Sequence, residues 1–416
     1  MRDIDRQTLS ITEGEQIEVA LSHEHYLMLK QRYAGRLDLA PSATTGHYIL
    51  TARDYIGRLT LPPNLLLEIR PKVAVSNLFY MLCVDAGLAE FFTPHIRLAQ
   101  GSDVFHFVIA AFISSVEQLA AQGLNHDYFP TEADLPLVRG RIDLGAQINR
   151  FGELRHRHAC AFAELSTDTA ENKVLLAALS QIPFLLGEHE ADTNRRARYV
   201  SRRFESVSPL ARSSALRLLA TMPSHRLNAR YGPALRLARL VLNHITLENR
   251  AGSYPFASFL VNMPRLFESF VTKGLSALVR PYGLKIVAQR HDYLDEERQI
   301  GIRPDMLVYE RHSAEPLLVI DTKYRLFDRG DINSDLYQVS AYLDRYGLDR
   351  GLLIYPQFQG TSRSNLRLVN TPKYLHVLPL NLDAATSTEL EALCGHLAGQ
   401  VALLSRASKA AEVSLE

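Results

Sequence analysis

Hydrophobic positions in the first hundred residues come in short runs, which is the pattern of β-strands. β-Branched and aromatic residues are frequent in the segments 47–56 (HYILTARDYI) and 65–69 (LLLEI). Apolar residues at helical spacing appear first at 78–88 and then over a longer stretch at 104–119. We therefore expect residues 1–100 to form a β-rich region.

The next segment, 101–255, mixes both patterns. Two strand-like runs at 138–148 and 159–165 follow its first helix. Either Asp168 or Thr169 is suited to cap a helix that begins just beyond it, because short polar side chains accept hydrogen bonds from the first turn. We expect a mixed, largely helical region here.

The pattern changes again after Pro255. Expected helices and strands follow one another at 264–279, 285–289, 299–309, 317–324, 334–346, 351–355, 374–380 and 387–404. This order predicts a compact α/β domain with a mixed sheet over 256–405, followed by a short tail at 406–416. The fold class expected for the whole chain is α+β with several domains.

Composition narrows the class of protein without identifying it. The chain has 416 residues, 47% of them hydrophobic and 22% charged, with a formal charge of +1, which is ordinary for a globular protein. Its three cysteines are far apart in sequence and fit a reducing cytoplasm. The amino terminus has no apolar signal-peptide core, and no apolar stretch is long enough to cross a membrane. We expect a cytoplasmic protein with no membrane partner.

Positive charge is concentrated in one segment, 195–239. It holds eleven arginines, one glutamate and no lysine, a formal excess of ten positive charges. Three interpretations remain open: the arginines pair with groups elsewhere in the fold, contact DNA, or form an interface with an acidic protein. The exclusive use of arginine favours planar, bidentate contacts over general solubility.

The segment with the clearest chemistry is GIRPD at 301–305, followed by PLLVIDTKYR at 316–325. Residues 311–315 make a natural hairpin turn, and a turn centred near 313 sets Asp305 opposite Asp321. Because side chains alternate along a strand, Lys323 shares a face with Asp321. Opposed like charges destabilise a hairpin unless something offsets the repulsion.

A divalent cation is the simplest offset, since hard carboxylate and carbonyl oxygens suit Mg²⁺, with Mn²⁺ as an alternative. Asp305, Asp321 and the Thr322 carbonyl are the expected ligands. Lys323 would then orient a water or neutralise charge on a phosphoryl group. The plain alternative is a surface hairpin with two solvated carboxylates and an ordinary lysine.

Two metal-binding aspartates with a lysine beside them are typical of a metal-dependent nuclease centre. Neighbouring residues extend this candidate centre. Glu268 lies on the helix before the hairpin and could add a carboxylate to the site. Gln338 and Tyr342 are four residues apart on the helix after it, so they share a face and could contact the lysine or a DNA phosphate. We also consider Arg303, Arg325 and Tyr342 as DNA-binding residues. No GxxxxGK[ST] loop occurs in the chain, so we expect it to bind no nucleotide by itself.

Asp305, the IDTKYR stretch and the start of the DLYQVSAY segment at 335–342 resemble the PD-(D/E)XK nuclease motif as it occurs in the McrC family. The resemblance covers about residues 45–385. It includes four upstream segments: LLLEIRPK (65–72), VRGRID (138–143), FAELSTDTAEN (162–172) and MPRLFESFV (263–271). The resemblance implies a C-terminal domain similar to restriction endonucleases. It also implies catalytic roles for Asp305, Asp321 and Lys323, with Glu268 as the helical acid and Gln338 as an accessory residue.

The family resemblance further implies a partner and a substrate. McrC proteins are nuclease subunits of McrBC restriction systems and act with McrB, a GTP-hydrolysing AAA+ ring, on double-stranded DNA that carries modified bases. Residues 1–250 would then be the region that docks on the ring and stimulates GTP hydrolysis. Two alternatives remain: an adaptor that mainly activates the GTPase while keeping the nuclease fold as a scaffold, and a stand-alone restriction nuclease of another class.

Overall fold

The computed structural model describes residues 7–61, 65–73, 75–88, 104–149, 156–185, 191–223, 226, 228–248, 256–325, 333–357, 364–369, 371–384 and 387–413. The chain divides into two compact units. The first combines residues 1–106 with residues 258–416, and the second consists of residues 107–257.

The amino-terminal part of the first unit is built on a mixed sheet. Strand β1 (Gln7–Thr12) runs parallel to β6 (Leu65–Arg70), and β6 is antiparallel to β5 (Tyr55–Leu61). Strand β11 (Phe256–Asn262) lies next to β5. At this contact, Gly57 has a φ of +129°, and a Cβ there would lie 1.9 Å from the Phe259 carbonyl oxygen. Only glycine therefore allows the two strands to approach this closely.

A smaller antiparallel sheet accompanies the first, as the strand-rich pattern of this region predicts. Its strands, in the order β2-β4-β3, are Gln16–Ala20, His47–Ala52 and Leu37–Pro41. Helix α1 (His23–Arg32) begins at Ser22, whose side chain accepts the His25 N–H. Helix α2 (Val75–Ala86) follows β6.

The carboxyl-terminal part of the first unit holds a six-stranded mixed sheet in the order β12-β15-β16-β17-β19-β18. These strands span Leu284–Ala288, Met306–Glu310, Pro316–Thr322, Arg350–Gln357, Tyr374–Asn381 and Ser364–Arg367. Strands β16, β17 and β19 are parallel, whereas β12–β15, β15–β16 and β18–β19 are antiparallel pairs. The carboxyl ends of β16, β17 and β19 thus share one edge of the sheet.

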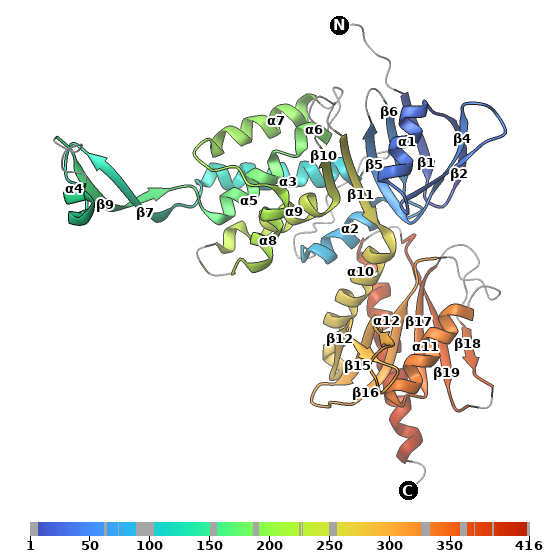
Figure 1. Cartoon of the computed structure of the whole chain (residues 1–416). Helices are drawn as coiled ribbons and strands as arrows, with labels where there is room; N and C mark the ends of the chain where they lie inside the picture. The colour runs from blue at the N-terminus through green and yellow to red at the C-terminus, as the bar shows by residue number, and fades with distance from the viewer. Residues whose placement is uncertain are drawn as a thin grey trace. The chain divides into compact units, whose positions relative to one another are not determined.

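Three helices pack on this sheet (Figure 1). Helix α11 (Asn333–Tyr346) buries Val339, Tyr342 and Leu343 in one core cluster with side chains of β15, β16, β17 and β19. Helices α10 (Met263–Leu278) and α12 (Ser387–Val413) pack against each other and against β16. Helix α12 continues past its expected end at Leu404, into the segment expected to be a tail.

One strand expected for this part was wrong in detail. The run at 299–309 is not one strand but β14 (Gly301–Ile302) and β15, with the segment before Asp305 unpaired between them. Strand β14 instead pairs with β13 (Asp292–Tyr293) in a small ribbon. Proline at 304 explains the break, since it has no N–H to donate to a neighbouring strand.

The second unit is mainly helical. Its helices are α3 (Val104–Gln122, entering from the first unit), α5 (Ala170–Leu179), α6 (Ile182–Leu185), α7 (Ala191–Ser201), α8 (Arg212–Thr221) and α9 (Gly232–His244). The 3-10 turns η3 (Arg202–Phe204) and η4 (Ala229–Tyr231) and strand β10 (Ile245–Glu248) complete it. Of the two expected caps, Thr169 is the one used, because its side chain accepts the Asn172 N–H at 3.4 Å.

A three-stranded ribbon extends away from these helices (Figure 1). It contains β7 (Asp127–Leu135), β8 (Arg141–Ile142) and β9 (His158–Ser166) in the order β7-β9-β8. Of the strand expected at 138–148, only Arg141 and Ile142 form a strand. Helix α4 (Leu144–Asn149) replaces it, because the Asp143 side chain accepts the Ala146 N–H and starts a helical turn.

Within the part of the chain that the structure describes, no helix is both long enough and apolar enough to span a bilayer.

Candidate active site

Two aspartates meet at one end of the β15–β16 hairpin. Met306 pairs with Ile320, so the same register sets Asp305 opposite Asp321. The pairing shifts farther along, where a bulge between Val308 and Tyr309 brings Tyr309 opposite Pro316. The register expected from the sequence is therefore confirmed at the end that carries the two carboxylates.

Asp305 is held by the strand that it faces. Its Oδ2 accepts the Thr322 N–H at 2.8 Å and the Thr322 hydroxyl at 2.7 Å. Its backbone carbonyl accepts the Gln289 N–H at 2.9 Å. The carboxylate thus has a fixed orientation although Asp305 itself lies outside the ladder of β15.

Asp321 is the more buried of the two carboxylates, with an exposed fraction of 2%. Its Oδ2 lies 2.6 Å from Lys323 Nζ. Lys323 Nζ also donates to Gln338 Oε1 at 2.8 Å, and Gln338 Nε2 donates to the Tyr342 hydroxyl at 2.7 Å. Strand β16 and helix α11 therefore fix the amine together, as the shared face of Gln338 and Tyr342 predicts.

Burial and like charge perturb the acidic groups of the site. Burial and the neighbouring Asp305 raise the pKa of Asp321 to about 7, although Lys323 opposes this. Burial lowers the pKa of Lys323, but the Asp321 carboxylate outweighs it, so the net shift is upward and the amine stays protonated. Burial, followed by Asp305, also raises the pKa of Glu268. Like charge is therefore crowded among the acids of the site, and Lys323 is the cation ion-paired with Asp321.

Gln289 joins Glu268 on α10 to Asp305. Its Nε2 donates to Glu268 Oε1 and, at 3.2 Å, to Asp305 Oδ1. Gln289 has a φ of 51°, in the left-handed region that side chains rarely adopt. Sequence reasoning missed this residue, because nothing in the local pattern marks the end of β12 as strained.

These residues line one cleft of about 770 Å³. Its walls include Glu268, Asp305, Asp321, Thr322, Lys323 and Gln338. Two exposed arginines, Arg303 and Arg265, also line it. Arg303 was expected from the sequence and Arg265 was not. The i+3 spacing of Arg265 and Glu268 on α10 was a signal that could have revealed it.

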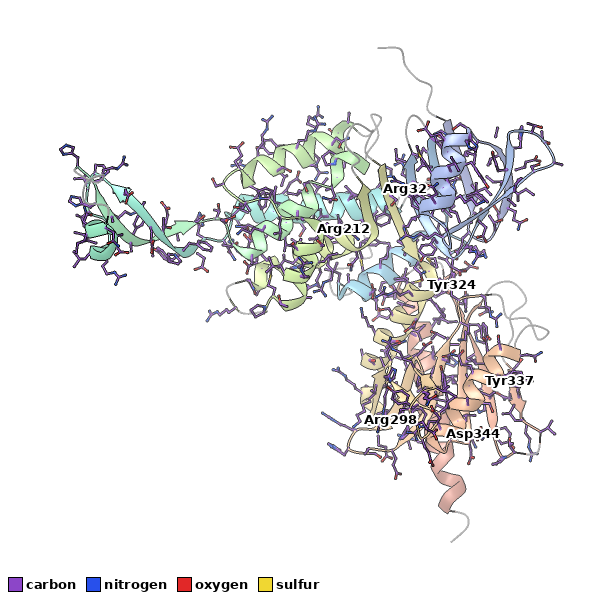
Figure 2. The ribbon with its side chains drawn as sticks, viewed as in Figure 1. Arg32, Arg212, Arg298, Tyr324, Tyr337 and Asp344 are labelled. Carbon is purple, nitrogen blue, oxygen red and sulfur yellow. The ribbon has the colours of Figure 1, made fainter. Side chains whose placement is uncertain are left out.

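The other two residues considered for DNA contact have different surroundings. Tyr342 is only 4% exposed and its hydroxyl accepts from Gln338, so little of its side chain is available for a DNA contact. One guanidinium nitrogen of Arg325 lies 2.6 Å from the Asp335 carboxylate, so an ion pair already engages it. Tyr324, labelled in Figure 2, is also buried, and its hydroxyl donates to Glu13 at 3.1 Å.

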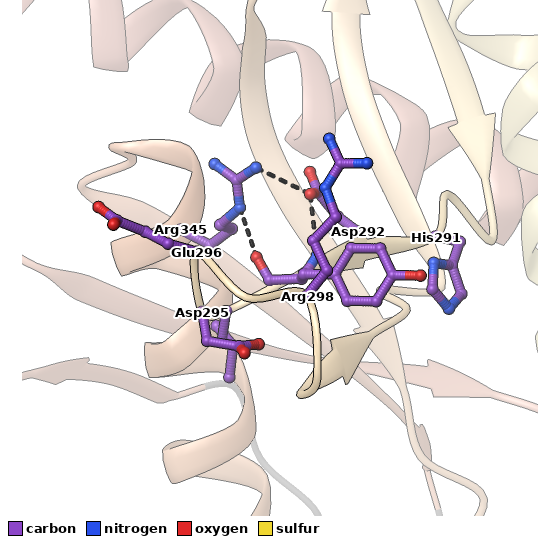
Figure 3. Close-up of a pocket in the computed structure, with 8 residues that line it drawn as sticks. His291, Asp292, Asp295, Glu296, Arg298 and Arg345 are labelled. Carbon is purple, nitrogen blue, oxygen red and sulfur yellow. Dashed lines mark hydrogen bonds and ion pairs between the residues drawn. The ribbon is translucent and has the colours of Figure 1, made fainter.

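A second cavity, of about 480 Å³, lies on the β13–β14 ribbon (Figure 3). Arg345 donates to the Asp292 carboxylate at 2.8 Å and to the Tyr293 carbonyl oxygen at 2.7 Å. The Asp295 carboxylate accepts two backbone N–H groups of its own loop. Arg345, Asp292 and Asp295 of this cavity thus hold the ribbon and its loop together.

The donor set of the cleft fits a hard divalent cation. Within the described residues, no three His, Cys, Asp or Glu side chains are arranged as a complete metal site. Mg²⁺ does not require one, because it keeps several waters and is often held by one or two carboxylates plus substrate phosphates. Two opposed carboxylates, one of them buried with a raised pKa, are suited to this role.

A comparison with protein-family models shows the family to which the chain belongs. The model described as "McrBC 5-methylcytosine restriction system component" matches residues 50–356. The chain belongs to this McrBC family. The match includes both aspartates and the lysine, and it confirms the family resemblance that the sequence motifs indicate.

Relatives of this McrBC family member are distant in sequence. The "Type IV methyl-directed restriction enzyme EcoKMcrBC" of Escherichia coli K12 is 22% identical over 308 residues, which cover 69% of this chain and 87% of the relative. A chain in a structure of Thermococcus gammatolerans McrB AAA+ hexamers with bound McrC aligns with a TM-score of 0.66 at 15% identity. That alignment covers 95% of this chain and 100% of the other, so the two share a fold.

Proposed function

We propose that this chain is the DNA-cleaving subunit of a McrBC-type restriction system. Its carboxyl-terminal domain would be a Mg²⁺-dependent endodeoxyribonuclease of the PD-(D/E)XK class. The observation that carries this proposal is the meeting of Asp305, Asp321 and Lys323 at one end of a hairpin, inside a cleft. Hydrolysis of a phosphodiester needs charge neutralisation at the phosphoryl group and an oriented water, and these groups are suited to supply both.

Each residue has a role that follows from its contacts. Asp305, oriented by Thr322, and Asp321 would hold the ion, and the Thr322 carbonyl would be a further ligand. Bound there, Mg²⁺ (or Mn²⁺) would supply positive charge to the transition state. Lys323, held by Asp321 and Gln338, would orient the attacking water or donate to a phosphate oxygen. Glu268 would assist from α10 through Gln289.

Binding of the DNA backbone would use the exposed arginines of the cleft, Arg265 and Arg303. Guanidinium groups bind phosphate oxygens in a bidentate manner, which positions the strand without reading its sequence. Arg325 would support the site indirectly, since its ion pair with Asp335 fixes the segment after Lys323 to the start of α11.

We also propose that the chain works with an AAA+ GTPase ring similar to McrB and stimulates its GTP hydrolysis. Two observations support this partner. The chain has no phosphate-binding loop of its own, and a chain of similar fold was solved in a complex with McrB AAA+ hexamers. Double-stranded DNA with modified bases is the substrate expected of such a system.

The test is cleavage of methylated duplex DNA by the chain together with its GTPase partner, GTP and Mg²⁺. Lys323→Ala and Asp321→Ala should each lower the cleavage rate at least 100-fold, which is typical for loss of a group that stabilises transition-state charge. Lys285→Ala is a matched control. Lys285 lies on β12 opposite Tyr309, at the end of the strand away from Asp305. Its cleavage rate should equal that of the unsubstituted chain.

GTP turnover, measured in the same reactions, separates this proposal from the adaptor alternative. A nuclease subunit with Lys323→Ala should still stimulate the partner's GTP hydrolysis while failing to cut. Cleavage at the unsubstituted rate by both variants would reject the catalytic assignment. GTP stimulation without any cleavage by the unsubstituted chain would favour the adaptor.

A further inference from the structure

Four of the eleven arginines in the 195–239 segment have clear structural roles. Three donate to carbonyl oxygens at or near helix carboxyl ends: Arg212 to Leu242 of α9 at 2.6 Å, Arg239 to Leu219 of α8 at 2.8 Å, and Arg230 to Gly123 after α3 at 2.8 Å. Such carbonyls have no partner within their own helix, and a cation there also opposes the helix dipole. These arginines therefore stabilise the second unit and are not available to a ligand.

A fourth arginine, Arg196, forms a bidentate pair with Glu117 on α3, with nitrogen–oxygen distances of 3.1 and 2.6 Å. This pair joins α7 to α3 and leaves the outer face of α7 to other residues. The interpretation that the arginines pair within the fold is thus correct for part of the segment.

A different group consists of Arg195 and Arg198 on the outer face of α7 and Arg202 at the start of η3, directly after it. We call these three residues the α7 arginine stripe. These positions are three and four residues apart, so their side chains follow one face of the helix. All three are exposed, and they line a concave surface of about 480 Å³ with Tyr199, which is 60% exposed. Helix α7 lies at one edge of its unit (Figure 1).

In the part of the chain that the structure describes, little negative charge opposes the stripe. Arg195 pairs with Asp192, one turn earlier on α7, and both side chains are more than 70% exposed. Exposed pairs of this kind contribute little energy, so the guanidinium can exchange its partner for a phosphate. Among the described residues, no ion pair or hydrogen bond is formed by the side chains of Arg198 and Arg202. The surface therefore retains an excess of positive charge.

The composition of this surface favours nucleic acid over protein as its ligand. Protein interfaces have an apolar centre depleted in charge, whereas DNA interfaces are polar and strongly positive. Tyr199 is the one large apolar side chain lining the concave surface, and guanidinium groups surround it. Arginine forks match phosphate oxygens, and a helix face presents them at regular intervals along a backbone.

We propose that the α7 arginine stripe is a second DNA-binding surface that contacts the phosphate backbone of duplex DNA. It belongs to the second unit, whereas every residue of the Asp305–Asp321 cleft belongs to the first. The inference rests on the proposed function in taking DNA as the ligand, but it requires no cleavage. The stripe binds DNA regardless of base sequence, as backbone contacts do.

The test measures duplex binding by the full-length chain with Lys323→Ala, by fluorescence anisotropy of a labelled duplex over a range of KCl concentrations. The triple variant Arg195→Gln, Arg198→Gln, Arg202→Gln should weaken binding about tenfold or more. Each lost phosphate contact lowers the slope of log K against log salt by about 0.9, so the slope should fall by about 2.7. The substitutions are on an exposed face, and circular dichroism should report an unchanged fold.

A matched control removes the same charge elsewhere. Arg280, Arg311 and Arg367 are exposed and lie at the edge of the six-stranded sheet opposite the two aspartates. Replacing all three with glutamine should leave the salt slope unchanged. If the control lowered the salt slope as much as the α7 triple variant does, net charge alone would explain the effect, and the proposal would be overturned.

Three other outcomes would also overturn it: no duplex binding by the chain without the arginine substitutions, an unchanged slope in the α7 triple variant, or loss of GTPase-partner binding in that variant with DNA binding intact. The last result would make the stripe a protein interface. None of these outcomes bears on the catalytic residues. Failure of the proposed nuclease would instead appear as cleavage that is independent of Lys323.

Discussion

The Asp305–Asp321 cleft and the arginines of 195–239 are both local concentrations of like charge, but the protein uses them differently. In the cleft, two carboxylates are set opposite each other, with Glu268 nearby and only one ion-paired amine, Lys323, against them. In the second unit, Arg212, Arg230 and Arg239 have internal acceptors, which are carbonyl oxygens at or near helix ends.

The contrast separates charges that stabilise the fold from charges that are candidates for function. Charge that has internal partners lowers the energy of the fold, and its removal should cost stability. Like charges that lack enough internal partners destabilise the fold, and they are expected where a bound ligand offsets that cost. A local charge excess in the sequence therefore marks a candidate site, and the structure decides which members of it remain available.

The largest effect should come from removing charge in the cleft. Asp305→Asn keeps an oxygen that can accept from Thr322 but removes one of the two facing negative charges. We expect cleavage to fall by about three orders of magnitude, because an ion held by a single carboxylate would bind weakly. The melting temperature should stay the same or rise, since repulsion with Asp321 is relieved. A large drop in melting temperature would mean that Asp305 is a structural residue.

Glu13 extends the comparison to a buried carboxylate outside the cleft. It is 2% exposed, and burial raises its pKa from 4.5 to about 7. Because the folded-state pKa is above the unfolded value, its stabilising contribution is complete below about pH 4.5 and is lost as pH rises through 7. Glu13→Gln removes this pH dependence. The free energy of unfolding of the variant, relative to that of the unsubstituted chain, should therefore be up to about 3 kcal/mol higher at pH 8 than at pH 4.

Denaturant unfolding of both proteins across this pH range measures the difference. Parallel stability curves for Glu13→Gln and the unsubstituted chain would show that Glu13 is not buried as a neutral acid. The Tyr324 hydroxyl donates to Glu13, so Tyr324→Phe serves as a control for loss of the hydrogen bond alone.

The smallest effect concerns the arginines. Arg212→Gln removes bonds to the Leu242 and Asn243 carbonyls and should lower the free energy of unfolding by about 2 kcal/mol. Arg198→Gln, on the exposed face of α7, should change it by less than about 0.5 kcal/mol. Equal effects of the two substitutions would contradict the division between structural and available arginines.

The hairpin of the site could be read from the sequence because its rules are local. A strand period of two and a turn centred near 313 suffice to set Asp305 opposite Asp321 and to bring Lys323 to the same face. The family motif then placed Glu268 and Gln338 in the same cleft. Both residues do line it, although their chemical roles remain proposals.

Other features depended on contacts distant in sequence. Gln289 reaches Glu268 and Asp305 through a left-handed backbone conformation that no local pattern marks. The burial of Tyr342 follows from the packing of α11 on the sheet. The carbonyl acceptors of Arg212 and Arg239 are set by where helices end in the folded unit, which arginine counting cannot foresee.

The central claim is that Asp305 and Asp321 together bind one divalent ion. Anomalous X-ray diffraction from crystals of the full-length chain soaked in Mn²⁺ tests it most directly. We predict one strong peak within about 2.5 Å of a carboxylate oxygen from each aspartate, and its loss in crystals of Asp321→Ala. No peak between the two carboxylates, or a peak that persists in Asp321→Ala, would contradict the claim.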